Sequence, residues 1–88
     1  MSGPLDTLVD LLPQLTSSEQ VARCDRKSVE ETLRWLKHPA DRDPREVARL
    51  EASHLETRLR EAEYLDRPDG YEALLQATVS LRRLSAGM

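Results

Sequence analysis

Two histidines and one cysteine are the side chains of this 88-residue chain best suited to acid–base or nucleophilic chemistry. Glu51 and His54 form a Glu-x-x-His motif. Helical proteins that hold two metal ions in a carboxylate site use two such motifs together with two further glutamates. This chain carries one copy, so a second chain would have to complete the site. The glutamates available for that purpose are Glu30, Glu31, Glu61 and Glu63. We expect a solvated helix face that contains a histidine, rather than a metal site.

A nucleophilic cysteine needs a histidine close enough to activate it. Cys24 and His38 are expected on one helix, where a rise of about 1.5 Å per residue separates them by about 21 Å and excludes this pair. Cys24 and His54 can still meet, but a lone cysteine beside an apolar stripe is usually a small core residue. His38 precedes Pro39 at a helix end, where histidines commonly contact the last carbonyl groups. We expect no catalytic set and no cofactor.

Five arginines are candidates for an anion-binding patch contributed by several helices. They are Arg58, Arg60, Arg67, Arg82 and Arg83. Glutamates and aspartates are interleaved with them, and such a mixture is typical of an ordinary helix surface held by pairs four residues apart. The alternative kept open is a small all-helical enzyme, or an anion- or metal-binding protein, that uses these arginines with Glu51 or His54 as a dimer.

The composition narrows the class of protein. Hydrophobic residues make up 39% of the chain and charged residues 33%, which suits helices with wide solvated faces. The chain lacks isoleucine and phenylalanine, so it is poor in the residues that favour strands. A net charge of −3 with both signs interspersed offers no basic field for nucleic acid.

The setting is expected to be the cytoplasm of a bacterium. The single cysteine, Cys24, cannot form an internal disulfide, which fits a reducing compartment. No apolar run approaches the roughly 18 residues of a membrane span, and no leader-like segment is visible, so no membrane insertion is expected. The arginine-rich, lysine-poor composition suggests a bacterial source.

Helical periodicity marks the first two elements. Apolar residues recur at helical spacing over residues 4–12, and Pro13 is expected to end this short helix because it lacks an N–H donor. Thr16 and Glu19 then read as a capping box, which predicts a second helix over residues 17–37.

Two signals that each combine an aspartate with a proline, Asp43-Pro44 and Pro68-Asp69, mark the remaining helices. Asp43 is a predicted N-cap before Pro44, and the third helix is expected over residues 44–66. Asp69 is the predicted cap of a fourth helix over residues 70–85. Short loops between helices imply antiparallel neighbours. The chain is therefore predicted to be one all-α domain over residues 1–88, a small antiparallel helical bundle with three main helices and a short N-terminal helix.

Leucines and aromatic residues in excess of a small core tend to mark a partner surface. The candidate partner-binding residues are Leu8, Leu12, Trp35, Leu55, Leu59 and Tyr64. The alternative, that these side chains complete the protein's own core, is equally compatible with the sequence. The seam of small residues and leucines from Ala48 to Ala62 could also join two copies of the chain, as in a dimeric antitoxin or regulator.

The middle of the chain resembles a known family. Residues Arg34–Leu65 contain a helix, the restart at Asp43-Pro44, and Leu55-Glu56-Thr57 followed by Tyr64-Leu65 on the second arm. This pattern resembles the small helical-hairpin co-chaperones that hold type III secretion needle subunits in the bacterial cytoplasm. The resemblance implies no enzymatic activity. It implies that one hairpin face packs against a second chaperone or a secreted helical subunit and prevents premature polymerisation.

The leading functional prediction is therefore a non-enzymatic interaction protein. As an adaptor or co-chaperone, it would cover the amphipathic helix of a partner with an apolar groove. The partner is expected to be another protein or a second copy of the chain.

Overall fold

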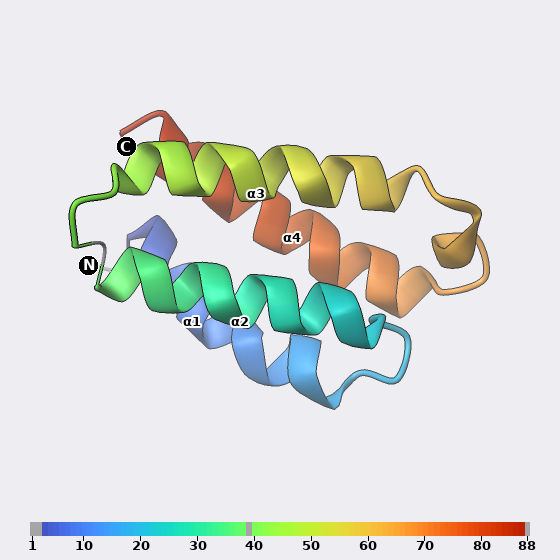
Figure 1. Ribbon diagram of the computed structural model, residues 1–88. Coiled ribbons are helices and arrows are strands. Elements are labelled where there is room, and N and C mark those ends of the chain that lie inside the picture. Colours follow the sequence, from blue (N-terminus) through green and yellow to red (C-terminus); the bar gives the residue numbers. More distant parts are fainter. Residues whose placement is uncertain (1–2, 39, 88) are drawn as a thin grey trace.

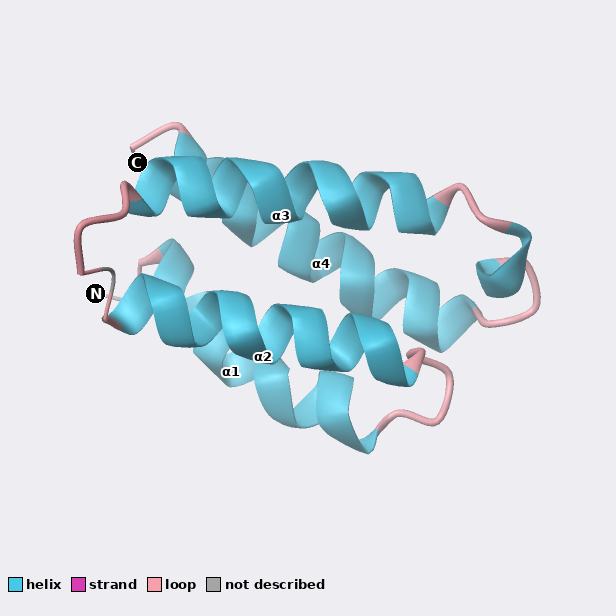
Figure 2. Cartoon of the chain, viewed as in Figure 1, coloured by secondary structure: helices cyan, strands magenta, loops and turns pink. Residues whose placement is uncertain are grey.

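Four helices of similar length make up most of the chain in the computed structural model, which describes residues 3–38 and 40–87. They are α1 (Pro4–Ser17), α2 (Arg23–Lys37), α3 (Pro44–Leu59) and α4 (Pro68–Ser85), with one turn of 3-10 helix, η1 (Ala62–Tyr64). The described residues contain no strand, which confirms the all-α prediction. Successive helices run in opposite directions, with α2 and α3 forming one layer and α1 and α4 the other (Figures 1 and 2).

Helix α1 is longer than predicted, because it continues through Pro13 to Ser17. A proline inside a helix costs about 3 kcal/mol, since it removes one hydrogen bond and crowds the preceding turn. The apolar stripe of α1 offsets this cost: Leu8, Leu11 and Leu15 are buried, and each buried leucine contributes about 1.5–3 kcal/mol. Pro13 itself lies on the exposed side. The prediction of a short N-terminal helix is therefore wrong.

Helix α2 begins at Arg23 instead of residue 17. Thr16 belongs to the last turn of α1 and Ala22 occupies the N-cap position of α2, so the helix start predicted at Thr16 is wrong. Residues 18–22 connect the two helices and are anchored by the buried Val21. Asp25, Val29 and Leu33 face inward from α2. The helix ends at Lys37, while Pro39, which was expected to end it, lies outside the described residues.

Helix α3 begins as predicted and ends early. The Asp43 side chain accepts a hydrogen bond from the Arg45 backbone N–H at 3.0 Å, as an N-cap should. The helix stops at Leu59 rather than near residue 66, and η1 follows. The break turns Tyr64 inward, where its side chain is 2% exposed.

Helix α4 begins at Pro68, two residues before the predicted start. Asp69 lies in the first turn and is not its cap, because Arg67 occupies the N-cap position. The capping acceptor comes from the α1–α2 connection: Gln20 Oε1 accepts hydrogen bonds from the backbone N–H groups of Asp69, at 2.7 Å, and Gly70, at 3.2 Å.

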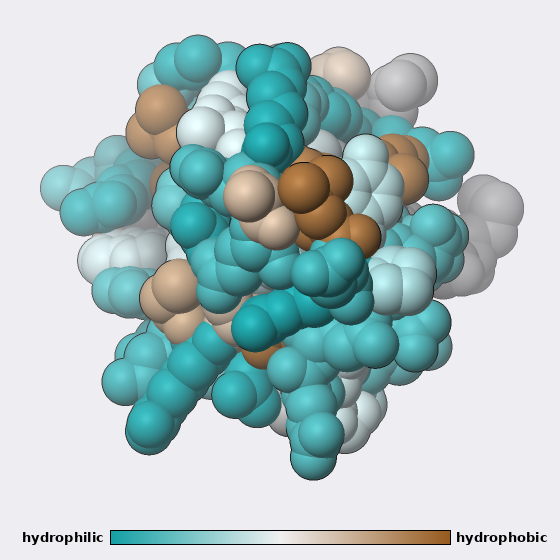
Figure 3. All heavy atoms as spheres, turned by 90° about the vertical axis from the view of Figure 1, so that its right-hand side faces the viewer, coloured by the Kyte–Doolittle hydropathy of each residue, from teal (hydrophilic) through white to brown (hydrophobic). Residues whose placement is uncertain are grey.

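The core lies between the two helix layers. Ala48, Ala52 and Leu55 of α3 are fully buried, as are Ala77 and Leu81 of α4. Small side chains allow two helices to approach closely, and α3 and α4 pack along much of their length. The small-residue seam predicted on α3 is thus used inside the chain. The end of the molecule formed by the α1–α2 and α3–α4 connections has a mainly hydrophilic surface (Figure 3).

Candidate functional site

The residues of the Glu-x-x-His motif contact different parts of α2. The Glu51 side chain is buried and accepts hydrogen bonds from the hydroxyl groups of Ser28 and Thr32. The His54 side chain is half exposed, with Nε2 3.9 Å from a carboxylate oxygen of Asp25. Within residues 3–38 and 40–87, no group of three or more histidine, cysteine, aspartate or glutamate side chains is placed to hold a metal ion.

The remaining candidates for nucleophilic chemistry lie on the surface. Cys24 is a free, exposed thiol in the first turn of α2. His38 is exposed at the opposite end of the same helix, where its backbone N–H donates to the carbonyl oxygen of Arg34 at 3.1 Å. The two residues thus occupy the two ends of α2, in keeping with the separation expected from the sequence.

A buried polar cluster, here named the Asp25 clasp, ties α2 to the end of α3 and to η1. Its members are Asp25, Arg58, Tyr64 and the backbone N–H of Ala22. The Asp25 side chain is 1% exposed and accepts hydrogen bonds from Arg58 Nε, at 2.9 Å, and from the Tyr64 hydroxyl. That hydroxyl in turn accepts a hydrogen bond from the Ala22 N–H at 3.1 Å. Arg58 also pairs with Glu63, so the guanidinium group joins two carboxylates.

The electrostatics of the clasp indicate a structural role. Burial and the hydrogen bond to Asp25 raise the pKa of Tyr64 to about 12. The hydrogen bonds to Asp25 and then Glu63 raise the pKa of Arg58 above its ordinary value. A general acid or base works best with a pKa near the operating pH. Tyr64 lies far from that condition, and the contacts of the clasp point to a role in holding α2, α3 and η1 together.

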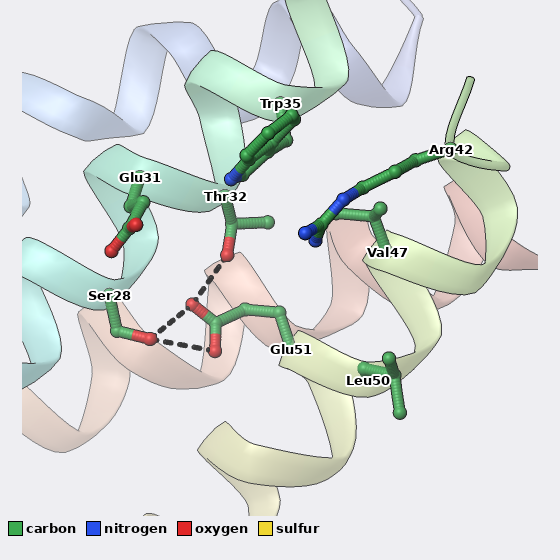
Figure 4. Close-up of a pocket in the computed structure, with 8 residues that line it drawn as sticks. All are labelled: Ser28, Glu31, Thr32, Trp35, Arg42, Val47, Leu50 and Glu51. Atoms are coloured by element: carbon green, nitrogen blue, oxygen red, sulfur yellow. Dashed lines mark hydrogen bonds between the residues drawn. The ribbon is translucent and has the colours of Figure 1, made fainter. Parts of the chain in front are cut away.

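A pocket with a cavity of about 250 Å³ opens between α2 and α3. It is lined by Ser28, Glu31, Thr32, Trp35, Arg42, Val47, Leu50 and Glu51 (Figure 4). Ser28 donates to the Glu51 carboxylate at 2.6 Å and Thr32 donates to it at 2.9 Å. The Arg42 side chain reaches into the same space, and its guanidinium carbon lies 4.2 Å from the centre of the Trp35 ring, a cation–π contact.

The arginines expected to form an anion site are largely committed to carboxylates. Arg58 belongs to the Asp25 clasp, Arg67 lies 3.7 Å from Glu63, and Arg82 donates to Glu56 at 2.8 Å. The hydrogen bond from Arg82 lowers the pKa of Glu56. Arg60 and Arg83 are exposed. Three of the five arginines are therefore engaged by carboxylates of the same chain.

The structure distributes the six predicted partner-binding residues unevenly. Leu8 and Leu55 are 0% exposed and Tyr64 is 2% exposed, because the core and the clasp use them. The remaining three are partly buried, namely Leu12, Trp35 and Leu59. The prediction of a partner surface is therefore corrected for the first three, since the folded chain presents none of them to a partner.

An exposed apolar row that the sequence analysis did not single out runs along α4. Tyr71, Leu75 and Val79 follow each other at four-residue spacing and are 41%, 38% and 44% exposed. We name this row the α4 ridge. The signal was present in the sequence, because α4 carries apolar residues on more than one face, but the periodicity of the buried residues masked it.

A groove lies on each side of the α4 ridge. One, of about 340 Å³, runs toward α3 and is lined by Glu56, Thr78 and Arg82 together with Leu75, Val79 and Arg83. The other, of about 400 Å³, runs toward α1 and is lined by Thr7 and Leu11 together with residues of α4 that include Leu75 and Val79. A ridge between two grooves is the surface form on which helices pack.

Comparisons with family models, curated proteins and solved structures found no match to this chain. None of the helices in the described part of the chain has the length and apolar character needed to cross a membrane.

Proposed function

We propose that this protein is a non-enzymatic helical interaction module, an adaptor or co-chaperone, whose α4 ridge binds an amphipathic helix of a partner. The observation that carries the proposal is the exposure of Tyr71, Leu75 and Val79 between two grooves. Helix-in-groove recognition uses apolar anchors that repeat every three or four residues. The α4 ridge has this spacing.

The size of the ridge limits the strength of binding. Completing the burial of three side chains that are already more than half buried contributes on the order of 2–4 kcal/mol. A micromolar complex needs about 8 kcal/mol. The partner helix must therefore also place side chains in the two grooves. This requirement favours a helix that is apolar on one face and polar on the other.

A second copy of the chain is one partner that meets this requirement. If two α4 helices pack antiparallel and centred on Ala77, Leu75 of each copy faces Val79 of the other. Glu72 of each copy then lies beside Arg82 and Arg83 of the other, so that opposite charges meet at both ends of the contact. A twofold interface repeats each contact once, which doubles the gain from one favourable pair.

A helical subunit of a secretion system is the other partner that we propose. The resemblance of Arg34–Leu65 to type III secretion co-chaperones supports this class of partner, and the exposed row on α4, outside the resembling residues, supplies the binding surface. In that case the α4 ridge would hold an amphipathic subunit helix in the cytoplasm before export. This role stays a prediction.

Light scattering across a range of protein concentrations tests the homodimer. We expect a concentration-dependent dimer that the double variant Leu75→Glu, Val79→Glu abolishes. The control is Leu65→Glu, which changes a leucine that is 81% exposed and lies outside both the α4 ridge and the α2–α3 pocket. A wild-type chain that stays monomeric excludes the homodimer.

Co-purification tests a heterologous partner. The wild-type chain, the α4 ridge variant and the Leu65→Glu control are used as baits under the same conditions. A partner retained by the wild type and the control, and lost with the ridge variant, supports the proposal. If the wild-type chain is monomeric and the ridge variant captures the same proteins as the wild type, the α4 ridge is not the binding surface.

A further inference from the structure

The pocket between α2 and α3 places a buried carboxylate at its base without a cation in direct ion-pair contact with it. Glu51 is 6% exposed, and its oxygens accept hydrogen bonds from Ser28 and Thr32. Among the described residues, no lysine, arginine or histidine forms an ion pair with Glu51. Buried carboxylates are ordinarily paired with a positive group. The two hydroxyl groups satisfy hydrogen bonds and leave the negative charge uncompensated.

The walls of the pocket suit a flat cation. The Trp35 ring forms one side, and Glu31 adds a second carboxylate to the lining. A guanidinium group stacks on aromatic faces and donates to carboxylates at its edge. Anions are disfavoured here, because both carboxylates repel them. The cavity of about 250 Å³ lies below the range of about 300–1,000 Å³ usual for whole ligands, and so suits a single side chain.

One cation already sits in this pocket. Arg42, from the loop between α2 and α3, lies over the Trp35 ring at 4.2 Å (Figure 4). Its side chain remains exposed in spite of this contact. Arg42 therefore shows which chemical group the indole face accepts, and its exposure leaves room for replacement.

We propose that the pocket binds an arginine side chain of another polypeptide, with the guanidinium group on Trp35 and its charge directed toward Glu51 and Glu31. Arg42 is the internal occupant that the incoming arginine displaces. This site is separate from the α4 ridge, so the proposal does not depend on the function proposed above.

The fluorescence of Trp35 reports on this site, because the chain contains one tryptophan. The probe is a capped Gly-Arg-Gly peptide, and the control is the same peptide with neutral citrulline in place of arginine. We expect saturable quenching or enhancement with the arginine peptide and none with the citrulline peptide. Calorimetry on the same samples provides a readout independent of the stacking state of Trp35.

Variants then identify the groups involved. Arg42→Gln removes the competitor, and the peptide should bind about two- to fivefold more tightly, as expected for one exposed cation–π contact. Glu31→Gln should weaken binding, whereas its neighbour Glu30→Gln should not, because Glu30 does not line the pocket. Glu51→Gln keeps hydrogen-bonding capacity for Ser28 and Thr32 and should abolish binding; circular dichroism checks that this variant is folded.

Three results would overturn the inference. They are equal binding of the arginine and citrulline peptides, unchanged affinity in Arg42→Gln, and equal affinity of the Glu30 and Glu31 variants. The last comparison keeps the test valid if Glu51→Gln fails to fold, because both glutamates are exposed neighbours in the sequence of α2 and only Glu31 lines the pocket.

Discussion

The Tyr64 hydroxyl donates a hydrogen bond to the Asp25 carboxylate, although 39 residues separate them in the sequence. The contact joins the first turn of α2 to η1, which follows the end of α3. It also explains how a carboxylate that is 1% exposed is accommodated, because Arg58 supplies a charge and Tyr64 a second donor.

Tyr64→Phe should destabilise the protein by about 1–3 kcal/mol, because it leaves the Ala22 N–H without its acceptor and removes a donor from the buried Asp25. Urea denaturation followed by circular dichroism measures the change. Tyr71→Phe is the matched control. Tyr71 is 41% exposed, so this substitution should change the free energy of unfolding by no more than about 0.5 kcal/mol. Equal effects of the two substitutions would show that the clasp contributes nothing to stability.

Alkaline pH should lower the stability of the folded protein, because Tyr64 ionises. Its pKa rises from 10.0 to about 12 on folding, so folding favours the neutral phenol. The resulting stabilisation is fully present below pH 10 and is lost as the pH rises toward 12. Ultraviolet titration of tyrosinate in Tyr71→Phe isolates Tyr64, and urea denaturation at each pH measures stability. If Tyr64 titrates at its ordinary pKa in the folded protein, its hydroxyl is neither buried nor hydrogen-bonded to Asp25 in solution.

Gly70→Ala should destabilise the protein, although alanine is the better helix former by about 1 kcal/mol. A Cβ at Gly70 would lie 2.3 Å from the carbonyl oxygen of Gln20, so backbone atoms must separate. We expect a loss of about 1–3 kcal/mol, as for other overpacked sites. Lys27→Ala, at an exposed position of α2, is the control and should change stability by less than about 0.5 kcal/mol. A more stable Gly70→Ala variant would contradict the close approach of α4 to the α1–α2 connection.

Substitution of the two aspartates that the sequence predicts as N-caps should have different effects on stability. Asp43→Ala should cost about 1 kcal/mol, because the side chain caps α3. Asp69→Ala should cost less than about 0.5 kcal/mol, because Gln20 caps α4 instead. Gln20→Ala should therefore cost more than Asp69→Ala. Thermal denaturation of the three variants checks this order of stability losses. A larger loss for Asp69→Ala than for Gln20→Ala would show that Asp69, and not Gln20, caps α4.

The hydroxyl group of Ser28 should be energetically coupled to the Glu51 carboxylate. Ser28→Ala should cost about 1–3 kcal/mol in the wild type, since a buried carboxylate loses its shortest hydrogen bond. In a Glu51→Leu background the same substitution should cost much less. A double-mutant cycle measured by urea denaturation gives the coupling energy. A coupling near zero would mean that Ser28 and Glu51 do not interact in solution.

The helical class and the start of α3 followed from local chemistry. The four-residue recurrence of leucine and alanine and the lack of isoleucine and phenylalanine can be seen in the sequence, and an aspartate before a proline is a local signal. The end of α3 was not predictable in this way, because the break at Leu59 depends on the distant partner of Tyr64. Pro13 misled for the same reason: the apolar packing of Leu11 and Leu15 outweighs the local cost of the proline.

The candidate binding surfaces were partly predictable. Trp35 was singled out as an aromatic residue, and it lines the α2–α3 pocket. Leu8 and Leu55 were indistinguishable from surface leucines, because the sequence alone does not show which helix faces meet. Asp25 was overlooked, although it lies four residues from both Val21 and Val29 and therefore interrupts an apolar face with a charge. A charge in that position is a readable sign of a buried polar contact.

The cap that Gln20 provides and the Asp25 clasp lie at the same end of the molecule, where α1 meets α2 and α3 meets α4 (Figure 1). The α2–α3 loop, with Arg42, lies at the opposite end. Fluctuations that open the helix layers should therefore start at the loop end and be stopped by the polar contacts at the other end. Amide hydrogen exchange should reveal this as a gradient along α2, fastest toward Lys37 and slowest toward Asp25.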